Sequence, residues 1–517
     1  MPENYLSFMS PLALIVILAF FWERFTARRK TLKLSPGPWK LPVVGNLHQM
    51  VTRKGPHLQL SMLAKRYGPI MQLKLGELQA IVISSPEIAK EVLKTNDVAF
   101  AQRPHMFSLE ILSFHRWGPV FCPYGDYWKQ VRKICVSELL TAKRVQSFRN
   151  IREEEVSSVI ESISSSHTDG VPFNLSRMIN NLTISIASRT IVGERFNEQG
   201  EFKQMVKKMF DLSGGFDLPD FFPSLKFLSM ITGAKDALEK LYIQENRIVE
   251  SIIQEHRMKK TATRSNKSDV DVDKPSYRQE QEDFVDVLLN LQELGGLDYD
   301  ITDDHIKAVV MDMFIAGSDT TATTIEWTMS ELLKNPSVLK KAQAEVRQAF
   351  QGKGNNESDV HQLDYLKLVV KESLRLHPPG PLLIRESRES CEIRGYEIPA
   401  HAHIIVNTWE MARDSKYWDD GDKFWPERFQ DSSIDFKGAN FEFLPFGAGR
   451  RICPGISFGT ITVELTIAQL LYHFDWELPN GMNPEELDMT ENFTFTCARK
   501  SDLNVIAIPC RSLIYTG

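Results

Sequence analysis

Cysteine is scarce in this 517-residue sequence and follows no regular spacing. The six cysteines, at positions 122, 135, 391, 453, 497 and 510, include no C-x-x-C pair, so neither a disulfide framework nor a zinc site is indicated. This usage fits a reducing compartment. The net charge of −6 is mild, which argues against a general nucleic-acid-binding protein. No internal repeat is apparent.

Long apolar runs are also rare, and residues 5–22 form the one candidate membrane segment. Eighteen helical residues reach about 27 Å, close to the ~30 Å hydrocarbon core of a bilayer. Basic residues follow at Arg24, Arg28 and Arg29, whereas residues 1–4 carry only one acidic side chain. The positive-inside rule therefore predicts a lumenal N-terminus and a cytosolic body. A basic start and a small-residue cleavage site are missing, so we expect an uncleaved anchor rather than a signal peptide.

The remaining chain is expected to form a basic, proline-rich hinge and one large domain. Residues 23–46 carry basic side chains and then three prolines, which stiffen a link. Residues 70–84 predict a β-hairpin and residues 392–407 predict short strands. Residues 259–283 are polar and predict a surface loop. Helical periodicity extends over 86–95, 127–141, 148–164, 175–192, 235–259, 301–334 (with Thr302 as N-cap) and 336–350. We therefore expect a mainly α domain with small β-sheets over residues 47–517.

Residues 446–455 read F-G-A-G-R-R-I-C-P-G and place a cysteine between glycines. Glycine accepts positive φ and close contacts, so this composition lets backbone N–H groups, those of Gly449 and Gly455, approach the Cys453 sulfur. The spacing F-x-x-G-x-R-x-C-x-G resembles the haem-binding loop of the haem-thiolate monooxygenases, the cytochrome P-450 superfamily. The resemblance implies a single large cytochrome P-450-type haem domain with haem b as its cofactor.

The resemblance assigns roles to the residues of this loop. Cys453 would ligate the haem iron as a thiolate, which favours O–O bond cleavage. Arg451 would supply a positive charge for a haem propionate, and Phe446, Gly447 and Gly455 would complete the haem cradle. Taken alone, a buried structural cysteine in a Gly/Arg turn would be the alternative.

The middle of the long helical segment carries a second motif. Residues 316–321 read A-G-S-D-T-T and resemble the A-G-x-[DE]-T-[TS] segment that crosses the distal haem face in this family. The resemblance places Ala316 against the haem and makes Asp319 and Thr320 an acid–alcohol pair for proton delivery. Thr320 is also expected to bond back to a carbonyl of its own helix. Without the cysteine loop, such a polar stretch would indicate a solvated helix face.

Two charged patterns match further parts of the family. Glu372 and Arg375 lie at i and i+3 on one predicted helix face. Together with Arg428, in a segment that resembles the family's P-E-R-F sequence, they look like the ion-pair triad that stabilises the cysteine side of the domain. An isolated E-x-x-R pair would be a solvated ion pair.

Haem propionates would be bound elsewhere in the chain. Trp128 and Arg132 form a W-x-x-x-R pair on one helix face, which contacts propionates in the family. Arg103 and Arg385 lie where related enzymes place further propionate arginines. Charge-assisted hydrogen bonds from these side chains would hold both carboxylates.

Alignment to the family draws the substrate pocket from five segments, 106–120, 210–231, 310–320, 381–384 and 492–496. Their apolar side chains predict a pocket for a hydrophobic substrate, with core packing as the alternative for each residue. The pocket residues that we expect are Phe107, Ile111, Leu112, Phe114, Met313, Phe314, Ile315, Leu383, Phe493 and Phe495.

These features together look like a plant microsomal monooxygenase. It would be a single-pass protein of the endoplasmic reticulum membrane with a cytosolic catalytic domain. No flavin or nicotinamide fold is present, so NADPH electrons would come through a separate NADPH–cytochrome P-450 reductase, with cytochrome b5 as a possible further partner. O₂ and a hydrophobic plant metabolite would be the substrates, and we expect a terpenoid such as a sesquiterpene or diterpene.

Alternatives remain at two levels. An indole alkaloid or a phenylpropanoid such as a flavonoid would suit the same apolar pocket. A reductase-independent haem-thiolate isomerase or dehydratase is more remote, because the Asp319–Thr320 pair and the anchor disfavour it. A non-catalytic haem or lipid carrier would have a degraded distal helix, and that is not seen.

Overall fold

The computed structural model describes residues 34–51, 55–166, 170–195, 218–227, 233–267, 282–351 and 356–510, with isolated positions at 205, 208, 209 and 229. The expected membrane segment, residues 5–22, lies outside these ranges. Within them, none of the helices combines the length and apolar character that a membrane span needs. The hinge residues from 34 onwards are described, and they dock on the body where the Asn46 side chain accepts a hydrogen bond from the Lys74 backbone.

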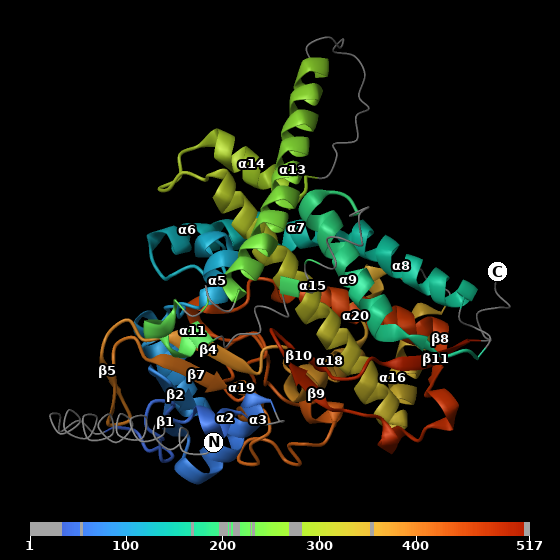
Figure 1. The fold of residues 1–517 in the computed structure, drawn as a ribbon. Helices are drawn as coiled ribbons and strands as arrows, with labels where there is room; N and C mark the ends of the chain where they lie inside the picture. The colour runs from blue at the N-terminus through green and yellow to red at the C-terminus, as the bar shows by residue number, and fades with distance from the viewer. Residues whose placement is uncertain are drawn as a thin grey trace, which may run out of the picture.

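One long central helix organises the fold (Figure 1). Helix α15 (Asp303–Lys334) begins at the predicted N-cap Thr302, whose side chain accepts a hydrogen bond from the His305 N–H. Helices α9 (Leu175–Val192), α14 (Phe284–Leu294), α18 (Asp364–Leu376) and α20 (Ile456–His473) pack around α15. Because α15 is covered on several sides, most of its side chains are buried and it carries the centre of the molecule.

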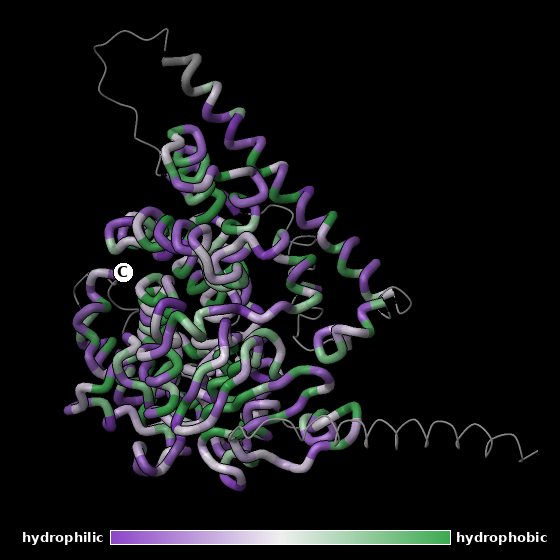
Figure 2. Tube along the Cα trace, turned by 90° about the vertical axis from the view of Figure 1, so that its left-hand side faces the viewer, coloured by the Kyte–Doolittle hydropathy of each residue, from purple (hydrophilic) through white to green (hydrophobic). Residues whose placement is uncertain are grey.

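The other helices complete the shell around this centre. Figure 2 shows α13 extending away from the rest of the fold. These helices are α2 (Leu47–Met50), α3 (Pro56–Tyr67), α4 (Pro86–Lys90), α5 (Phe107–Leu112), α6 (Asp126–Ile134), α7 (Ala142–Ser147), α8 (Arg149–Ser166), α11 (Leu218–Phe221), α13 (Ala234–Lys267), α16 (Pro336–Phe350), α17 (Glu357–Val360) and α19 (Thr408–Met411).

The strands form small sheets (Figure 1). The largest has the order β1-β2-β7-β4, and the predicted hairpin supplies its first two strands in antiparallel register. Strands β2 and β7 run parallel, with Ile81 opposite Ile404. The strands are β1 (Ile70–Leu75), β2 (Leu78–Ile83), β3 (Phe173–Asn174), β4 (Leu382–Glu386), β5 (Cys391–Ile393), β6 (Tyr396–Ile398), β7 (His403–Asn407), β8 (Phe474–Glu477), β9 (Glu491–Phe493), β10 (Cys497–Arg499) and β11 (Asn504–Pro509).

The structure confirms the mainly helical class with small sheets and corrects two local expectations. Helix α13 continues through Lys267, so the first part of the expected surface loop is helical, and the rest of it lies outside the described residues. Helices α14 and α20 were not expected. A capping box between Asp283 and Asp286 marks the start of α14, whereas α20 is buried along most of its length and shows little alternation of polar and apolar residues.

Candidate active site

The cysteine loop contains a short 3₁₀ turn at Gly449–Arg451, and Cys453 lies between this turn and the start of α20 at Ile456. The Cys453 N–H donates to the Phe446 carbonyl at 3.0 Å, which closes the loop on itself. The sulfur accepts a hydrogen bond from the backbone of Gly455, and burial raises the pKa of the Cys453 thiol while that bond opposes the shift. The sequence predicted that the Gly449 N–H approaches the Cys453 sulfur, but the structure shows another role for this glycine. It has φ +69°, and a Cβ there would collide with the Leu93 carbonyl, so this glycine serves close packing.

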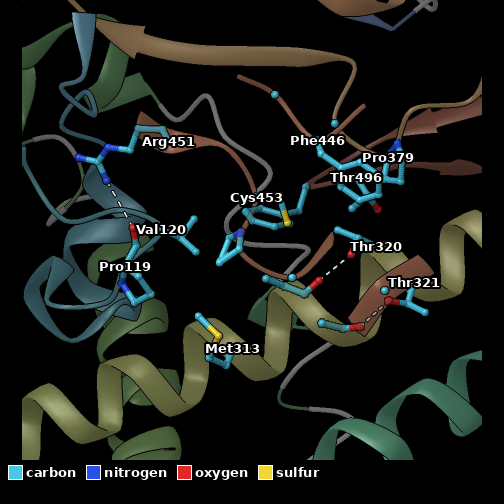
Figure 3. Close-up of a pocket in the computed structure, with 18 of the residues that line it drawn as sticks. Pro119, Val120, Met313, Thr320, Thr321, Pro379, Phe446, Arg451, Cys453 and Thr496 are labelled. Atoms are coloured by element: carbon cyan, nitrogen blue, oxygen red, sulfur yellow. Dashed lines mark hydrogen bonds between the residues drawn. The ribbon is translucent and has the colours of Figure 1, made fainter. Parts of the chain in front are cut away.

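The wall of α15 faces the sulfur across an interior cavity of about 430 Å³ (Figure 3). The cavity is lined by Cys453 on one side and by Ala316, Gly317 and Thr320 on the other. A Cβ on Gly317 would meet no atom within 4 Å, so glycine leaves additional room at this point. As expected, Thr320 bonds back to its own helix, with its Oγ1 2.6 Å from the Ala316 carbonyl.

Asp319 has a partner outside its own helix. Its Oδ2 accepts a hydrogen bond of 2.7 Å from the Thr496 hydroxyl, which comes from the segment between β9 and β10. Burial raises the pKa of Asp319, and the hydrogen bond from Thr496 counteracts this shift. The two residues that the sequence grouped as a pair therefore have separate hydrogen-bond partners, Ala316 for Thr320 and Thr496 for Asp319.

Four arginines and a tryptophan gather at one end of the cavity. Arg103, Arg132, Arg385, Arg451 and Trp128 all contribute to its lining. They come from the loop before α5, from α6, from β4 and from the cysteine loop. The sequence expectation that these side chains converge is therefore seen in the geometry.

The electrostatics of this cluster leave positive charge without a carboxylate partner. Arg451 donates to the carbonyls of Ala101 and Cys122, and burial together with the charge of Arg103 lowers its pKa to about 8. Burial and the neighbouring Arg103 and Arg451 also lower the pKa of Arg385 well below its usual range. Across the described ranges, none of the four arginines at the cavity forms an ion pair with an acidic side chain.

These observations test whether a haem would fit. A haem would need a ligand for its iron and cations for its two propionates. Cys453 supplies the first, and the four arginines supply the second, with Trp128 stacked under Arg451 and its N–H bonded to the Pro119 carbonyl. Gly317 supplies open space on the opposite face. The donor set and the cavity therefore fit a haem.

A buried ion-pair triad lies behind the cysteine side of the domain. Arg375 binds Glu372 through two hydrogen bonds of 2.8 Å, and both side chains are fully buried. Arg428 adds a third contact to Glu372 at 2.9 Å. Arg375 also donates to the carbonyls of Ala412 and Gly421, so it joins α18 to the loop that follows α19.

Four of the ten expected pocket residues line the cavity: Met313, Leu383, Phe493 and Phe495. The other six do not line it and pack into the adjacent apolar core between α5, α13, α14 and α15. Four of the six come from α5 and the turn after it, which pack against α13, so that only Leu109 of α5 lines the cavity, and the other two lie on a face of α15 that packs into the same core. The six are Phe107, Ile111, Leu112, Phe114, Phe314 and Ile315.

Sequence reasoning also missed part of the wall. Ala187, Thr190 and Ile191 reach the cavity from α9, and Phe284 reaches it from α14. None of these lies in the five expected segments. The α9 residues belong to an amphipathic helix whose buried face gives no signal for a cavity.

Comparisons with known proteins agree with this geometry. The cytochrome P450 family model matches residues 35–502. Premnaspirodiene oxygenase of Hyoscyamus muticus is 49% identical over 98% of this chain and 99% of its own length. Desmethyl-deoxy-podophyllotoxin synthase of Sinopodophyllum hexandrum is 50% identical over 97% of both chains. Melianol synthase CYP71BQ5 of Azadirachta indica is 49% identical over 97% of this chain and 96% of its own.

Solved structures show the same fold. A zebra fish cytochrome P450 with abiraterone superposes with a TM-score of 0.72 at 24% identity, over 88% of this chain and 99% of that one. The family model and the relatives cover nearly the whole length. The chain therefore belongs to the cytochrome P450 family and is a haem-thiolate monooxygenase, in which Cys453 ligates the haem iron and a reductase supplies the electrons.

Proposed function

We propose that this protein is a membrane-bound monooxygenase that oxidises an apolar plant specialised metabolite, and that this metabolite is a terpenoid. The observation that carries the proposal is the apolar part of the cavity between Cys453 and α15. Met313, Leu383, Phe493 and Phe495 line it, in addition to the cationic groups. An apolar wall with few polar groups selects a hydrophobic ligand.

The relatives support this substrate class. Premnaspirodiene oxygenase is named for the oxygenation of a diene, and melianol synthase for the formation of an alcohol. Both cover nearly the whole of this chain at about half identity. A terpenoid that has gained oxygen is therefore the product class that we propose for this enzyme.

The cation cluster positions the cofactor in this proposal. When bound, the haem supplies the oxidising chemistry, in which one atom of O₂ enters the substrate and the other leaves as water. Arg103, Arg132, Arg385 and Arg451 would neutralise the propionates, and Trp128 would support this site by stacking on Arg451. The Gly455 N–H stabilises the Cys453 thiolate.

Proton delivery falls to Asp319 and Thr320. The reaction consumes two protons for each oxygen molecule, and these must reach a cavity whose walls are largely apolar. Asp319 is a buried acid with a raised pKa, so it holds a proton close to neutral pH more readily than an exposed aspartate. Thr320 presents its hydroxyl at the cavity wall.

We assign Glu372, Arg375 and Arg428 a structural role.

Membrane attachment and location belong to the same proposal. The uncharged segment 5–22, followed by basic residues, would anchor the protein in the endoplasmic reticulum membrane. The hinge 23–46 would join the anchor to the catalytic domain. NADPH–cytochrome P-450 reductase, with cytochrome b5 as a second donor, would then meet this domain on the cytosolic side.

A substrate panel tests the proposal. Microsomes containing this chain and a plant reductase are incubated with NADPH and with sesquiterpenes, diterpenes, an indole alkaloid and a flavonoid, and products are detected by mass spectrometry. We expect a terpenoid product heavier by one oxygen, absent with Cys453→Ala. A product from the alkaloid or flavonoid alone would overturn the terpenoid assignment.

Microsomal fractionation of a variant lacking residues 1–22 tests the anchor, since we expect that variant to leave the membrane fraction more readily.

A further inference from the structure

Thr496 connects the distal acid to the segment that contacts the substrate. Its hydroxyl donates to Asp319 Oδ2 at 2.7 Å, although the two residues lie 177 positions apart. Thr496 is buried at 3% exposure, and it also lines the cavity (Figure 3). A second hydroxyl, that of Thr323 on the next turn of α15, lies 3.4 Å from the Thr496 hydroxyl. Thr496 therefore stands between the cavity and one face of α15.

The β9–β10 hairpin, whose connecting segment carries Thr496, is fixed to its surroundings on both sides. The Cys497 carbonyl accepts a hydrogen bond of 2.9 Å from the Trp327 indole of α15. The Cys497 N–H donates to the Pro379 carbonyl at 2.9 Å. At the far end of the hairpin, Glu491 binds the His57 ring at 2.7 Å. The backbone at Thr496 is thus held in place, so its hydroxyl can fix the orientation of another group.

The neighbours of Thr496 in the hairpin face the substrate space. Phe493 and Phe495 line the cavity from the same segment, within three residues of Thr496. One hydrogen bond, from the Thr496 hydroxyl, therefore connects the Asp319 carboxyl to the segment that supplies Phe493 and Phe495 to the cavity wall.

We propose that Thr496 is a positioning residue for proton delivery, which holds the Asp319 carboxyl in one orientation and links it to the substrate-contacting segment. The proposal deepens the proposed function, since it takes Asp319 as the proton-delivering acid. One carboxylate oxygen of Asp319 is occupied by the Thr496 hydroxyl. The other oxygen then has a defined direction from which to exchange a proton.

The chemistry of the contact explains why a hydroxyl is needed. Valine has nearly the same shape as threonine but cannot donate, so Thr496→Val removes the hydrogen bond with little change in packing. The Asp319 carboxyl would then lose its partner and sample more than one orientation. A hydrogen bond to a charged or partly charged group contributes more than a neutral one, so its loss should reduce proton delivery about three- to tenfold.

The first test measures how NADPH electrons are used. Holoenzyme with reductase and a substrate from the panel is assayed for product and hydrogen peroxide per NADPH consumed. We expect Thr496→Val to give about three- to tenfold less product per NADPH, with more peroxide and an unchanged spectroscopic dissociation constant for the substrate. Thr496→Ser should restore coupling because it keeps the hydroxyl. In protein that already carries Asp319→Asn, adding Thr496→Val should cause little further loss of product per NADPH.

A matched control separates this effect from the general cost of deleting a buried hydroxyl. Thr466 on α20 is buried at 1% exposure, and its Oγ1 donates to the Thr462 carbonyl at 2.7 Å. It does not line the cavity, and Thr466→Val should leave coupling unchanged. Equal loss of coupling in Thr466→Val and Thr496→Val would overturn the proposal.

The second test needs no substrate and therefore stands even if the proposed substrate class is wrong. Infrared difference spectra are recorded on photolysis of the reduced carbon-monoxide complex, and the carboxyl band of Asp319 is the one lost in Asp319→Asn. We expect Thr496→Val to shift this band to higher frequency and Thr496→Ser to return it. A band at the same frequency in all Thr496 variants would show that the hydroxyl does not hold Asp319 and would overturn the proposal. If Thr496→Val does not retain haem, Thr496→Ala provides the same comparison.

Discussion

The guanidinium of Arg451 lies 4.2 Å above the indole ring of Trp128, and both side chains donate to the same carbonyl, that of Pro119. The stacked pair fixes a buried positive charge at the wall of the cavity, beside three further arginines. A planar guanidinium on an aromatic face keeps its orientation better than a lysine would. The pair therefore prepares one end of the cavity for carboxylates before any ligand binds.

The first prediction concerns this charge. Arg451→Leu should leave the protein folded but reduce haem content per chain, because one propionate loses its cation. Haem content is measured by the pyridine haemochrome assay on purified protein. The neighbouring Arg450 is half-exposed and pairs with Asp97, so Arg450→Leu is the control and should retain haem. Equal haem loss in both variants would contradict the role of Arg451.

A second prediction concerns the buried triad. Glu372→Gln leaves Arg375 and Arg428 with weakened partners inside the protein, and breaking a buried ion pair costs about 3–5 kcal/mol. We expect little haem-loaded protein and a lower unfolding midpoint in urea. The half-exposed pair of Lys341 and Glu427 offers a comparison, since Lys341→Gln should change the midpoint far less. Similar midpoints for the two variants would refute the structural role.

A third prediction separates the cavity wall from the core. Met313 lines the cavity, whereas its neighbour Phe314 is 2% exposed and packs into the core. Met313→Ala should change the ratio of products or the substrate dissociation constant while the fold is retained. Phe314→Ala should lower the free energy of unfolding by about 3–5 kcal/mol and leave the product ratio unchanged in the protein that folds. Chromatography of the products together with urea unfolding distinguishes the two. Altered products with Phe314→Ala alone would contradict the assignment.

A fourth prediction concerns stability against pH. Burial raises the pKa of Glu326 from 4.5 to about 7, against a hydrogen bond from Ser176 that lowers it. The folded state therefore holds a proton that the unfolded state releases between about pH 4.5 and 7, so this group reduces the free energy of unfolding as pH rises through that window. The shift corresponds to about 3 kcal/mol.

Glu326→Gln removes this titration and keeps an acceptor for Ser176. Urea unfolding of the two proteins at several pH values provides the measurement, because other titrating groups affect both equally. We expect the variant to gain stability relative to the natural protein as pH rises from about 4.5 to 7. Parallel stability profiles would show that the pKa of Glu326 is not raised in the folded protein.

Local motifs predicted much of this architecture. Periodicity and capping signals predicted the hairpin of β1 and β2 and helices α9, α15 and α16. The predicted ends of these elements lie within a few residues of the observed ends. The cysteine loop and the A-G-S-D-T-T segment are short enough to be recognised whole. The structure places these two motifs on opposite walls of one cavity. This placement agrees with the haem site that the family resemblance implied.

Contacts between distant segments could not be predicted in the same way. Thr496 and Asp319 are 177 residues apart, and His57 and Glu491 are 434 apart, so no local pattern joins them. The expected pocket failed at Phe107 and Phe114 for a related reason. An apolar residue on a short helix can face a cavity or a neighbouring helix, and only the packing of α13 against α5 decides between them.

The most direct test of the account follows the oxygen atoms. Microsomes with this chain and reductase are supplied with NADPH, ¹⁸O₂ and a terpenoid from the panel, and the product is analysed by mass spectrometry. We expect a product with one ¹⁸O atom, which depends on both NADPH and Cys453. A product that forms without NADPH, or that carries no ¹⁸O, would contradict monooxygenation and favour a rearrangement of the substrate instead.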